Sequence, residues 1–591
     1  MDWREAVEKG ELIAGVLNAV VIIVLAVTHR WWGWSVELAP GPGVDVSQRA
    51  AVSGLANSKI PTPLWWGALA VVVVLAGAAR WPFAHSSLWW DEVWNVRNAT
   101  VGKFIPDKKR PGEFRFVESS WAQALWNFRK PTNHPPFTLL SKACHEVWAR
   151  ATRAPKGRFD EFVIRLPNFM VSLATVALLA WLLRAWGFPV AGLVAALLLA
   201  LHPWHIRYGI DGRAYSLLTF ATVAGFWCLW KMLGSGGQRR PVWWWLFGLN
   251  QALIVWCHLL SAWICAAFAA AAAIVIWRQF PSAIRRSALL RLLAMNVVGA
   301  MVFLQLFLPN LLQALEWGER NQDGNALDWN YFLTTLSQLC FGVDAHYDQM
   351  AAPGLVSLTS IMNENLMDAA RVVFVAFGLL PVLVLGYWQL WKRQRVAAIS
   401  IACLIAAAAL FIGIVAVTKM YFYHRFAIAC VVPFCALLPL PLDSVPQLRG
   451  RWIAVKAALV FLICAALQGV WIYQQRVLWE RSYAPLREVA QFLQNQAPGR
   501  VIGYGFGSEA LNGYWEKVEI LKESPTRDAL EDALAPDAPL YVVYGYEGLN
   551  RAALPDGFEL LDDPARFFVK RRFYGIDPQF AFQVLQAKRA R

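Results

Sequence analysis

The chain has 591 residues, of which 58% are hydrophobic and 16% are charged, and its mean hydropathy is +0.40. A soluble globular protein averages roughly 25% charged residues, so this composition excludes that class and indicates an integral membrane protein. The basic residues behind the net charge of +15 are scattered rather than gathered in one stripe, which argues against nucleic acid as a partner and for contact with membrane lipid.

Apolar stretches near the length needed to cross about 30 Å of hydrocarbon recur from Leu12 to Ile472. They predict a mostly α, polytopic transmembrane helical bundle of about 11 to 13 spans, with Trp clusters at many span ends. The first stretch lacks a following small-residue cleavage pattern, so we expect it to be retained, but the sequence does not decide whether it crosses the membrane. The predicted spans lie near residues 12–28, 62–79, 165–183, 188–201, 214–232, 242–256, 259–277, 292–310, 368–390, 397–417, 425–441 and 452–472.

The connections between these spans fall into two alternating sets. One set is short and basic, as at Arg239-Arg240 and at residues 278–291, and the positive-inside rule predicts that it is cytoplasmic. The other set is therefore expected to face outward, and its first member, 80–164, is a large extracytoplasmic loop. We interpret residues 311–367 as either a cover over substrates or a solvated loop. The outward set comprises residues 80–164, 202–213, 257–258, 311–367, 418–424 and everything after 473.

Hydropathy drops after Ile472, where short apolar strands alternate with helical patterns. This alternation predicts a small C-terminal α/β domain, and the segment has no dinucleotide-binding or phosphate-loop motif. The expected organisation is an N-terminal span and loop (1–61), a membrane domain (62–475) and an extracytoplasmic α/β domain (476–591). The expected strands are Val501–Tyr504, Val518–Leu521 and Leu540–Tyr544, and the expected helices are Leu486–Leu493, Ser508–Tyr514 and Thr526–Leu534.

Two adjacent acids, Asp91 and Glu92, follow the second predicted span in an aromatic setting. Partial burial makes a carboxylate a better base, and a neighbouring acid or metal can give two carboxylates different roles. The alternative is an acidic pair solvated by lipid headgroups. Asp91 and Glu92 are also the candidate ligands for a divalent metal ion, although no HExxH or comparable spacing supports one.

Further polar residues lie in the outward connections. His134 precedes Pro135-Pro136 at a predicted helix start, a place that suits an anion. Arg213 can bind a phosphate or carboxylate through its planar fork, or simply pair with Asp211. Each of these residues alone could be a packing partner, but together with the acids they indicate a site at one membrane face. The other members of this set are His202, His205, Arg207, Tyr215, His258, His424 and Arg425.

Nine cysteines lie mainly within apolar segments, where they are expected to pack as small hydrophobic residues. Cys144 and Cys340 fall in the outward set instead. A disulfide between them is therefore a candidate.

The order of these motifs resembles the C-type glycosyltransferase superfamily, specifically the protein-mannosyltransferase-like group that includes the bacterial lipid A aminoarabinose transferases. The resemblance covers roughly residues 62–475. The motifs that carry it are Asp91-Glu92, His134-Pro135-Pro136, Arg165-Leu-Pro167 and the segment Tyr208 to Tyr215.

The resemblance implies an enzyme of the bacterial inner (plasma) membrane that moves a sugar, with inversion, from a polyprenyl-phosphate-linked donor to a hydroxyl of a lipid, glycan or protein acceptor. The active site and the C-terminal domain would be extracytoplasmic. Asp91 would be the general base, and Glu92 would orient the acceptor or bind a metal. His134, Arg213 and Arg425 would bind the donor phosphate, and the substrate-binding candidates would be His202, His205, Arg207, Tyr215, His258 and His424.

The alternative function is a polytopic lipid or sugar transporter or flippase without transferase chemistry. Transporters usually hold their ionisable residues near the bilayer midplane and often contain inverted repeats. Here the charged residues lie at span ends on one side, and no repeat is evident. The sequence therefore favours the transferase.

Overall fold

The computed structural model divides into two compact units. The helical unit comprises Met1–Arg80, Phe128–Phe137 and Asn168–Gln474, and the mixed unit comprises Trp81–Asn127, Thr138–Pro167 and Gln475–Arg591. The structure describes residues 2–33, 61–106, 109, 114–129, 132–234, 240–320, 332, 335–336, 339–341, 373–418, 423–447, 451–480, 482–496, 499–504, 507–515, 518–520, 539–546, 558–574 and 580–588.

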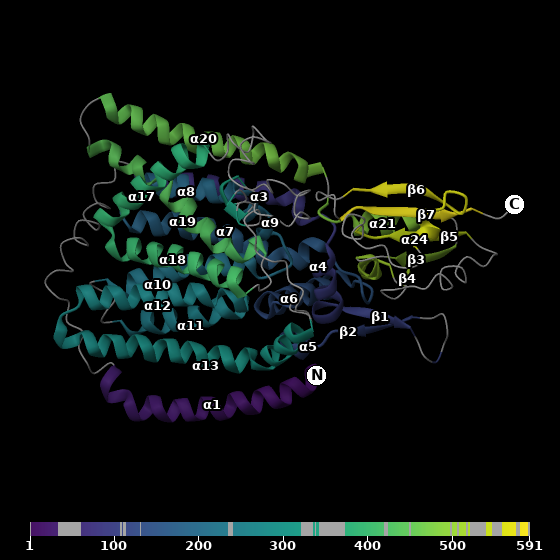
Figure 1. Cartoon of the computed structure of the whole chain (residues 1–591), viewed down its shortest axis with the longest axis horizontal. Coiled ribbons are helices and arrows are strands. Elements are labelled where there is room, and N and C mark those ends of the chain that lie inside the picture. Colours follow the sequence, from purple (N-terminus) through teal and green to yellow (C-terminus); the bar gives the residue numbers. More distant parts are fainter. Residues whose placement is uncertain are drawn as a thin grey trace. The chain divides into compact units, whose positions relative to one another are not determined.

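Nine helices within these ranges are long and apolar enough to cross a membrane (Figure 1). A tenth span is formed if α8 (Pro189–Leu201) and α9 (Pro203–Gly209), which meet at a bend of 63°, count as one broken span. The nine lie in α1 (Trp3–Trp32), α3 (Thr62–Ala84), α7 (Glu161–Ala185), α10 (Tyr215–Leu233), η2 with α12 (Leu259–Gln279), α13 (Ser282–Arg320), η4 with α17 (Phe374–Arg393), α18 (Arg395–Thr418) and the run of η5, α19 and η6 (His424–Gln447).

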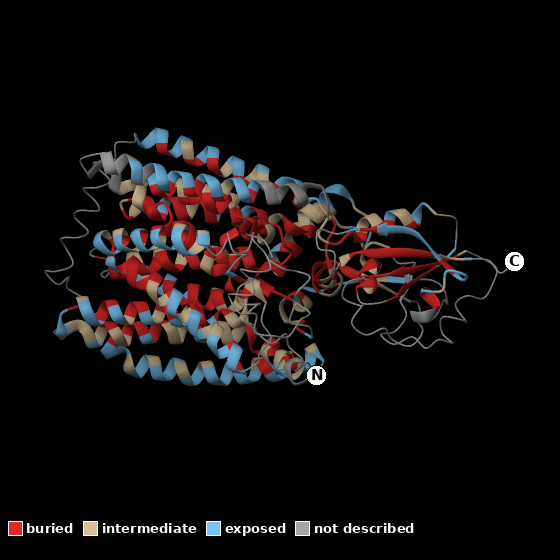
Figure 2. Cartoon of the chain, turned by 45° about the horizontal axis from the view of Figure 1, so that its top comes forward, coloured by how far each residue is buried: buried red, intermediate tan, exposed pale blue. Residues whose placement is uncertain are grey.

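Each predicted span falls on a helix, which confirms the polytopic bundle. The remaining two spans correspond to α11 (Pro241–Cys257) and to the apolar part, Ala458–Ile472, of α20 (Arg451–Glu480). Several helices continue beyond the predicted apolar stretch, because a helix keeps its backbone hydrogen bonds where it leaves the hydrocarbon while its side chains become polar. Buried residues fill the inside of the bundle, and exposed apolar residues lie on its peripheral faces, where lipid would meet them (Figure 2).

Small residues allow α11 and α13 to pack backbone against backbone. A Cβ atom added at Gly248 would lie 2.5 Å from the Met295 carbonyl oxygen, and one added at Gly299 would overlap the Gly248 carbonyl oxygen. Close approach of this kind is a common way for helices to associate in lipid, where no hydrophobic force drives them together.

Helix α1 runs antiparallel to α13 over its whole length. Near one end of α1, the buried Arg291 of α13 donates to the carbonyl oxygens of Trp32 and Gly33. Towards the other end, Gln305 donates to Glu11 at 2.5 Å, and Asp2 pairs with Arg129. The first apolar stretch therefore pairs with a full span, and the N-terminus lies at the same end of the helical unit as Arg129.

The mixed unit contains a five-stranded sheet of strand order β4-β3-β5-β7-β6. Strands β4 (Val518–Ile520), β3 (Arg500–Tyr504) and β5 (Leu540–Tyr544) are parallel, and β7 (Phe582–Ala587) and β6 (Phe567–Phe573) add antiparallel pairs. Helices α21 (Leu486–Gln494) and α24 (Phe558–Leu561) and the 3-10 turn η7 (Ser508–Gly513) complete this part. The predicted C-terminal α/β domain is confirmed, although Ser508–Tyr514 forms a 3-10 turn rather than an α-helix.

Most of the predicted outward loop 80–164 belongs to the same unit as this sheet. It forms α4 (Trp90–Asn95), the π-helical turn η1 (Val96–Thr100), the hairpin of β1 (Gly102–Pro106) and β2 (Phe114–Glu118), α5 (Trp121–Trp126) and α6 (Pro135–Thr152). Leu88, Trp89 and Val93 share one apolar core with Leu486 and Phe582 of the C-terminal part. The two compact units separate between Gln474 and Gln475, beside the predicted division at residue 475. The mixed unit also includes Trp81–Asn127 and Thr138–Pro167, because apolar residues far apart in sequence are buried together.

Of three other sequence predictions, one is wrong, and two fall wholly or mostly outside the described residues. The nine cysteines are all free, so the candidate disulfide between Cys144 and Cys340 is wrong. Cys144 belongs to the mixed unit, whereas Cys340 is buried in the core of the helical unit. The helix predicted at Thr526–Leu534 and most of the predicted loop 311–367 lie outside the described residues.

The pairing of α1 with α13 predicts which residues share a membrane face. In a chain without native cysteines, Asp2→Cys and Arg129→Cys should react with a membrane-impermeant maleimide from the same side of the membrane, because residues 2 and 129 are in contact. Ser282→Cys, at the opposite end of α13, should react only from the other side. Labelling of Ser282→Cys from the same side as Asp2→Cys would contradict the antiparallel arrangement, and labelling of Asp2→Cys and Arg129→Cys from opposite sides would contradict their contact.

Candidate active site

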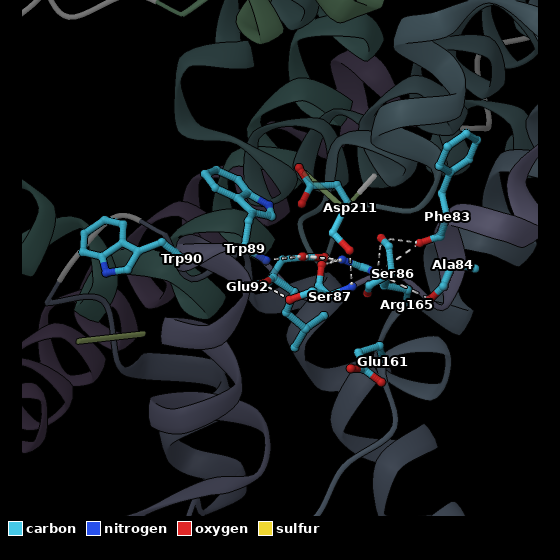
Figure 3. Close-up of polar contacts among 12 residues, drawn as sticks. Phe83, Ala84, Ser86, Ser87, Trp89, Trp90, Glu92, Glu161, Arg165 and Asp211 are labelled. Atoms are coloured by element: carbon cyan, nitrogen blue, oxygen red, sulfur yellow. Dashed lines mark hydrogen bonds and ion pairs between the residues drawn. The ribbon is translucent and has the colours of Figure 1, made fainter. Parts of the chain in front are cut away.

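A buried ion pair organises the segment that carries the two acids. Arg165, one turn into α7, donates through Nε to Glu92 Oε1 at 2.8 Å and through Nη2 to Glu92 Oε2 at 2.6 Å (Figure 3). Both side chains are almost fully buried, and the two-pronged contact fixes the relative orientation of guanidinium and carboxylate. Glu92 also accepts from the backbone N–H of Trp89 at 3.0 Å.

The same arginine binds the chain that connects α3 to α4. Its Nη1 donates to the carbonyl oxygens of Phe83 at 3.1 Å and Ser86 at 2.6 Å, and its Nη2 donates to that of Ser87 at 3.1 Å (Figure 3). These carbonyl groups lie at and just beyond the end of α3, where no further helical N–H can reach them. Arg165 therefore fixes both the acid pair and the turn that precedes it.

Asp91 lies in the first turn of the short helix α4 and is 6% exposed. The helix is anchored on its other side by Asn95, whose amide donates to Thr138 at 3.1 Å. Because both oxygens of Glu92 bind Arg165, the two neighbouring acids have different environments. Glu92 is held in an internal ion pair with Arg165, whereas Asp91 is not part of that pair.

The acid pair does not fit a metal site. Glu92 would have to give up Arg165 to coordinate a cation, and such an exchange would leave the guanidinium buried beside a second positive charge. Within the part of the chain that the structure describes, no group of three or more His, Cys, Asp or Glu side chains could hold a metal ion.

A second polar cluster lies in the helical unit and joins residues from three connections. The Arg213 Nε donates to His134 Nε2 at 3.0 Å, and His134 Nδ1 lies 2.7 Å from the Cys257 carbonyl oxygen. Since an arginine can only donate, His134 Nε2 must be the acceptor, and its Nδ1 must carry the proton that binds Cys257. This arrangement defines one neutral tautomer of His134.

The lowered pKa of His134 agrees with this neutral tautomer. Burial lowers the pKa of His134 well below its usual value of 6.5, and the charges of Arg213 and Arg425 lower the pKa further. His134 is thus uncharged at neutral pH. The positive charge of this cluster lies on the arginines, and His134 orients Arg213.

Tyr215 and His258 complete the cluster. The Tyr215 ring centroid lies 5.6 Å from that of His134 and 6.0 Å from that of His258, and the Arg213 guanidinium lies 5.3 Å from the Tyr215 ring. Among the described residues, the buried hydroxyl of Tyr215 and the Nδ1 atom of His258 have no hydrogen-bond partner. Buried polar atoms without partners are uncommon, and here two of them lie beside an arginine. The cluster can therefore offer hydrogen bonds and positive charge to an anion.

Arg425 and His424 approach this cluster from the start of η5 (His424–Cys430). The Arg425 guanidinium lies 3.8 Å from the Tyr423 ring, and His424 Nδ1 lies 2.6 Å from the Thr335 hydroxyl. Phe426, in the same turn, packs on the His258 ring at a centroid distance of 4.6 Å. Four connections of the helical unit thus meet here.

The structure places His202 and His205 in a different cluster. His202 Nδ1 accepts from the Trp204 N–H at the start of α9, and its Nε2 donates to the Leu339 carbonyl oxygen at 2.8 Å. His205 Nδ1 lies 2.7 Å from Nη2 of the buried Arg80. Arg207 lies near the Tyr208 ring, at 5.9 Å. The two histidines support the bend between α8 and α9.

Three residues of these networks escaped the list of predicted site residues. Arg165 appeared only as part of a motif, and nothing in the sequence paired it with Glu92. Arg80 directly follows the predicted span 62–79 and lies inside α3, where a buried arginine donates to backbone carbonyl oxygens. Asn168 donates to the backbone carbonyl oxygens of Asp211 and Arg213, a contact that leaves no trace in the sequence.

No protein-family model matches the chain, and no curated protein matches it. Among solved structures, it is similar to ArnT from Cupriavidus metallidurans bound to undecaprenyl phosphate, with 13% identity over 89% of this chain and 98% of that chain and a TM-score of 0.48. The chain is also similar to the apo state of that ArnT, with 14% identity over 88% of this chain and 97% of that chain and a TM-score of 0.47. A third similar structure is the apo oligosaccharyltransferase of Archaeoglobus fulgidus, with 12% identity over 87% of this chain and 74% of that chain and a TM-score of 0.41.

The buried ion pair predicts a large loss of stability when one partner is removed. Arg165→Leu should lower the free energy of unfolding by about 3–5 kcal/mol, because the Glu92 carboxylate then stays buried without its cation. Arg150→Leu is the matched control, since Arg150 is exposed and its pair with Glu146 contributes under about 1 kcal/mol. Denaturant unfolding of the detergent-purified variants measures both losses, and equal losses would contradict the structural role of Arg165.

The neutral state of His134 predicts a pH dependence of stability. The folded-state pKa lies well below the unfolded value of 6.5, so the unfolded chain binds more protons as the pH falls through 6.5, and stability decreases. His134→Gln removes this titration, so the loss of unfolding free energy between pH 6.5 and 5.5 should be smaller than in the unmodified protein by about 1 kcal/mol. Identical losses in the two proteins would show that His134 is not buried in its neutral form.

Proposed function

We propose that this protein is a membrane glycosyltransferase that moves a sugar from a polyprenyl-phosphate-linked donor to an acceptor hydroxyl on the extracytoplasmic face. The observation that carries the proposal is the buried cluster of Arg213, His134, Tyr215 and His258, in which two polar atoms have no partner among the described residues beside an oriented arginine. An anionic group of a ligand would satisfy these atoms, and a phosphate suits an arginine fork.

In the proposed reaction, Asp91 accepts the proton of the acceptor hydroxyl while the hydroxyl oxygen attacks the anomeric carbon. The bond from that carbon to the phosphate oxygen breaks, and the polyprenyl phosphate leaves with the bonding electron pair. Arg213, oriented by His134, and Arg425 stabilise the negative charge that grows on the leaving phosphate. A single displacement of this kind inverts the configuration at the anomeric carbon.

Glu92 and Asp91 have different roles in this proposal. Glu92 keeps its ion pair with Arg165 throughout, and so acts by holding α4 rather than by touching substrate. Asp91, on the same helix, is the general base. Their adjacency in sequence follows from this division, because one acid anchors the turn of helix that presents the other.

The remaining candidates take supporting roles. The Tyr215 hydroxyl and His258 Nδ1 would donate to the donor phosphate or accept from the sugar, and His424 would hold the turn that carries Arg425. His202 and His205 would act through the bend of α8 and α9, with Arg207 nearer the substrate path. The lipid-anchored donor would reach the enzyme within the inner (plasma) membrane, and the acceptor would be a lipid, a glycan or a protein.

The decisive variant is Asp91→Asn, which preserves the size of the side chain and removes its basicity. Sugar transfer from a panel of polyprenyl-phosphate-linked donors should fall by roughly 10²- to 10⁴-fold, the usual contribution of a general base, while the unfolding temperature stays unchanged. Asp160→Asn is the matched control, because Asp160 only caps the Val163 N–H at 3.0 Å and an asparagine can do the same. Transfer at the parental rate by Asp91→Asn would contradict the assignment of the base.

The same assay separates the transferase from the alternative transporter or flippase. A transporter would bind the lipid-linked donor and move it across vesicle membranes, but would leave the bond between sugar and phosphate intact. Transport of intact donor together with no detectable transfer to a mixture of lipid, glycan and peptide acceptors would favour the transporter.

A further inference from the structure

The helix that carries Asp91 begins without a capping residue of its own. The N-cap of α4 is Trp89, whose side chain has no hydrogen-bond acceptor. The first N–H groups of a helix need acceptors from elsewhere. Glu92 supplies one for Trp89, but the N–H of Trp90, the residue directly before Asp91, needs another.

The C-terminal part of the chain supplies the missing acceptors. The Tyr546 hydroxyl accepts from the Trp90 N–H at 3.2 Å, and the Tyr514 hydroxyl accepts from the Leu88 N–H at 2.6 Å. Glu509 accepts from the Trp90 indole at 2.9 Å, and its backbone carbonyl accepts from Arg97 at 3.0 Å. Contacts from residues more than 400 positions away thus surround both ends of the segment 88–97.

The backbone around these contacts has unusual features. Tyr546 adopts φ +46°, a left-handed conformation that is uncommon for a bulky residue and costs free energy. Gly507 has φ +89°, and a Cβ there would lie 2.6 Å from the Tyr546 ring. A Cβ at Gly513 would overlap Val93 Cγ1 of α4. The C-terminal part is therefore shaped to hold Tyr546 in place and to approach α4 closely.

Apolar packing alone does not account for the hydroxyl of Tyr546. Its ring packs on Phe580 and Phe582 at centroid distances of 4.6 and 5.4 Å, contacts that phenylalanine would make equally well. Burial raises the pKa of this hydroxyl well above its usual value, so it stays protonated over the whole physiological pH range. The contact with the Trp90 amide therefore does not depend on ionisation of Tyr546.

We propose that the C-terminal part of the chain positions the general base: Tyr546 and Glu509 are positioning residues that fix the N-terminal turn of α4 and thereby the carboxylate of Asp91. The inference rests on the proposed function for its catalytic consequence, but not for the contacts themselves. It gives the C-terminal part of the chain a role in the proposed reaction, through the position of Asp91.

The test compares Tyr546→Phe with Tyr541→Phe. Tyr541 lies in β5, is buried in the same apolar core as Tyr546, and its substitution likewise removes one hydroxyl. Hydrogen–deuterium exchange with residue-level fragmentation follows the Trp90 amide in the full-length, detergent-purified chains. We expect this amide to exchange about tenfold faster in Tyr546→Phe, because its acceptor is gone, and at the parental rate in Tyr541→Phe. Unchanged exchange in Tyr546→Phe would overturn the proposed contact.

Transfer kinetics then test the catalytic consequence with whichever donor of the panel the unmodified protein uses. In Tyr546→Phe, kcat should fall roughly 3- to 30-fold while KM for the donor and the unfolding temperature stay within error, because only the base is misplaced. Glu509→Gln, which keeps an acceptor for the Trp90 indole, should retain most of the kcat that Glu509→Leu loses. Faster amide exchange with an unchanged kcat would overturn the positioning role. Absence of transfer by the unmodified protein would instead count against the proposed function and leave the exchange result standing.

Discussion

The pair of Arg165 and Glu92 is the interaction on which the arrangement of the candidate site depends. Five hydrogen bonds of one guanidinium within 3.1 Å join a carboxylate and three backbone carbonyl groups. Moving both charges from water into a buried environment is costly, so an ion pair of this kind persists only where the geometry satisfies nearly every donor and acceptor. The consequence is a rigid turn between α3 and α4, from which Asp91 projects at a defined place.

In the cluster around Arg213, an arginine is again oriented by a hydrogen-bonded partner, but the partner is of a different kind. Here the arginine is oriented by a neutral histidine rather than by an acid, since His134 accepts from Arg213 and donates to Cys257. A carboxylate in that place would set a negative charge beside the arginine, whereas a neutral acceptor fixes the direction of Arg213 without adding a charge. One arginine is thus held by an acid and the other by a neutral histidine.

The ion pair and the arginine cluster are built from different parts of the chain. The ion pair needs residues from α4 and the start of α7, and the helix it anchors needs further acceptors from the C-terminal sheet region. The arginine cluster needs the connections before α6, α10 and α12 and the turn at η5. Polar residues at the ends of helices therefore form the hydrogen bonds that join distant segments, while the apolar middle parts of the helices form the surrounding core.

Much of this architecture follows from the sequence alone. Apolar stretches predict spans because lipid leaves a backbone no choice except helices with internal hydrogen bonds, and each predicted span does fall on a helix. The alternating pattern after Ile472 likewise predicts the parallel strands β3, β4 and β5. These properties are local, so neighbouring residues are enough to specify them.

Only the tertiary structure decided the contacts between distant segments. Nothing near Glu92 indicates Arg165, and no local pattern joins Trp90 to Tyr546 or separates His205 from His134. The strands β6 and β7 and the common core of residues 88–101 with the C-terminal part were also missed, because burial depends on which faces meet in space. The sequence determined which segments are helical and where polar residues gather at the ends of helices, and tertiary packing determined which of those residues are partners.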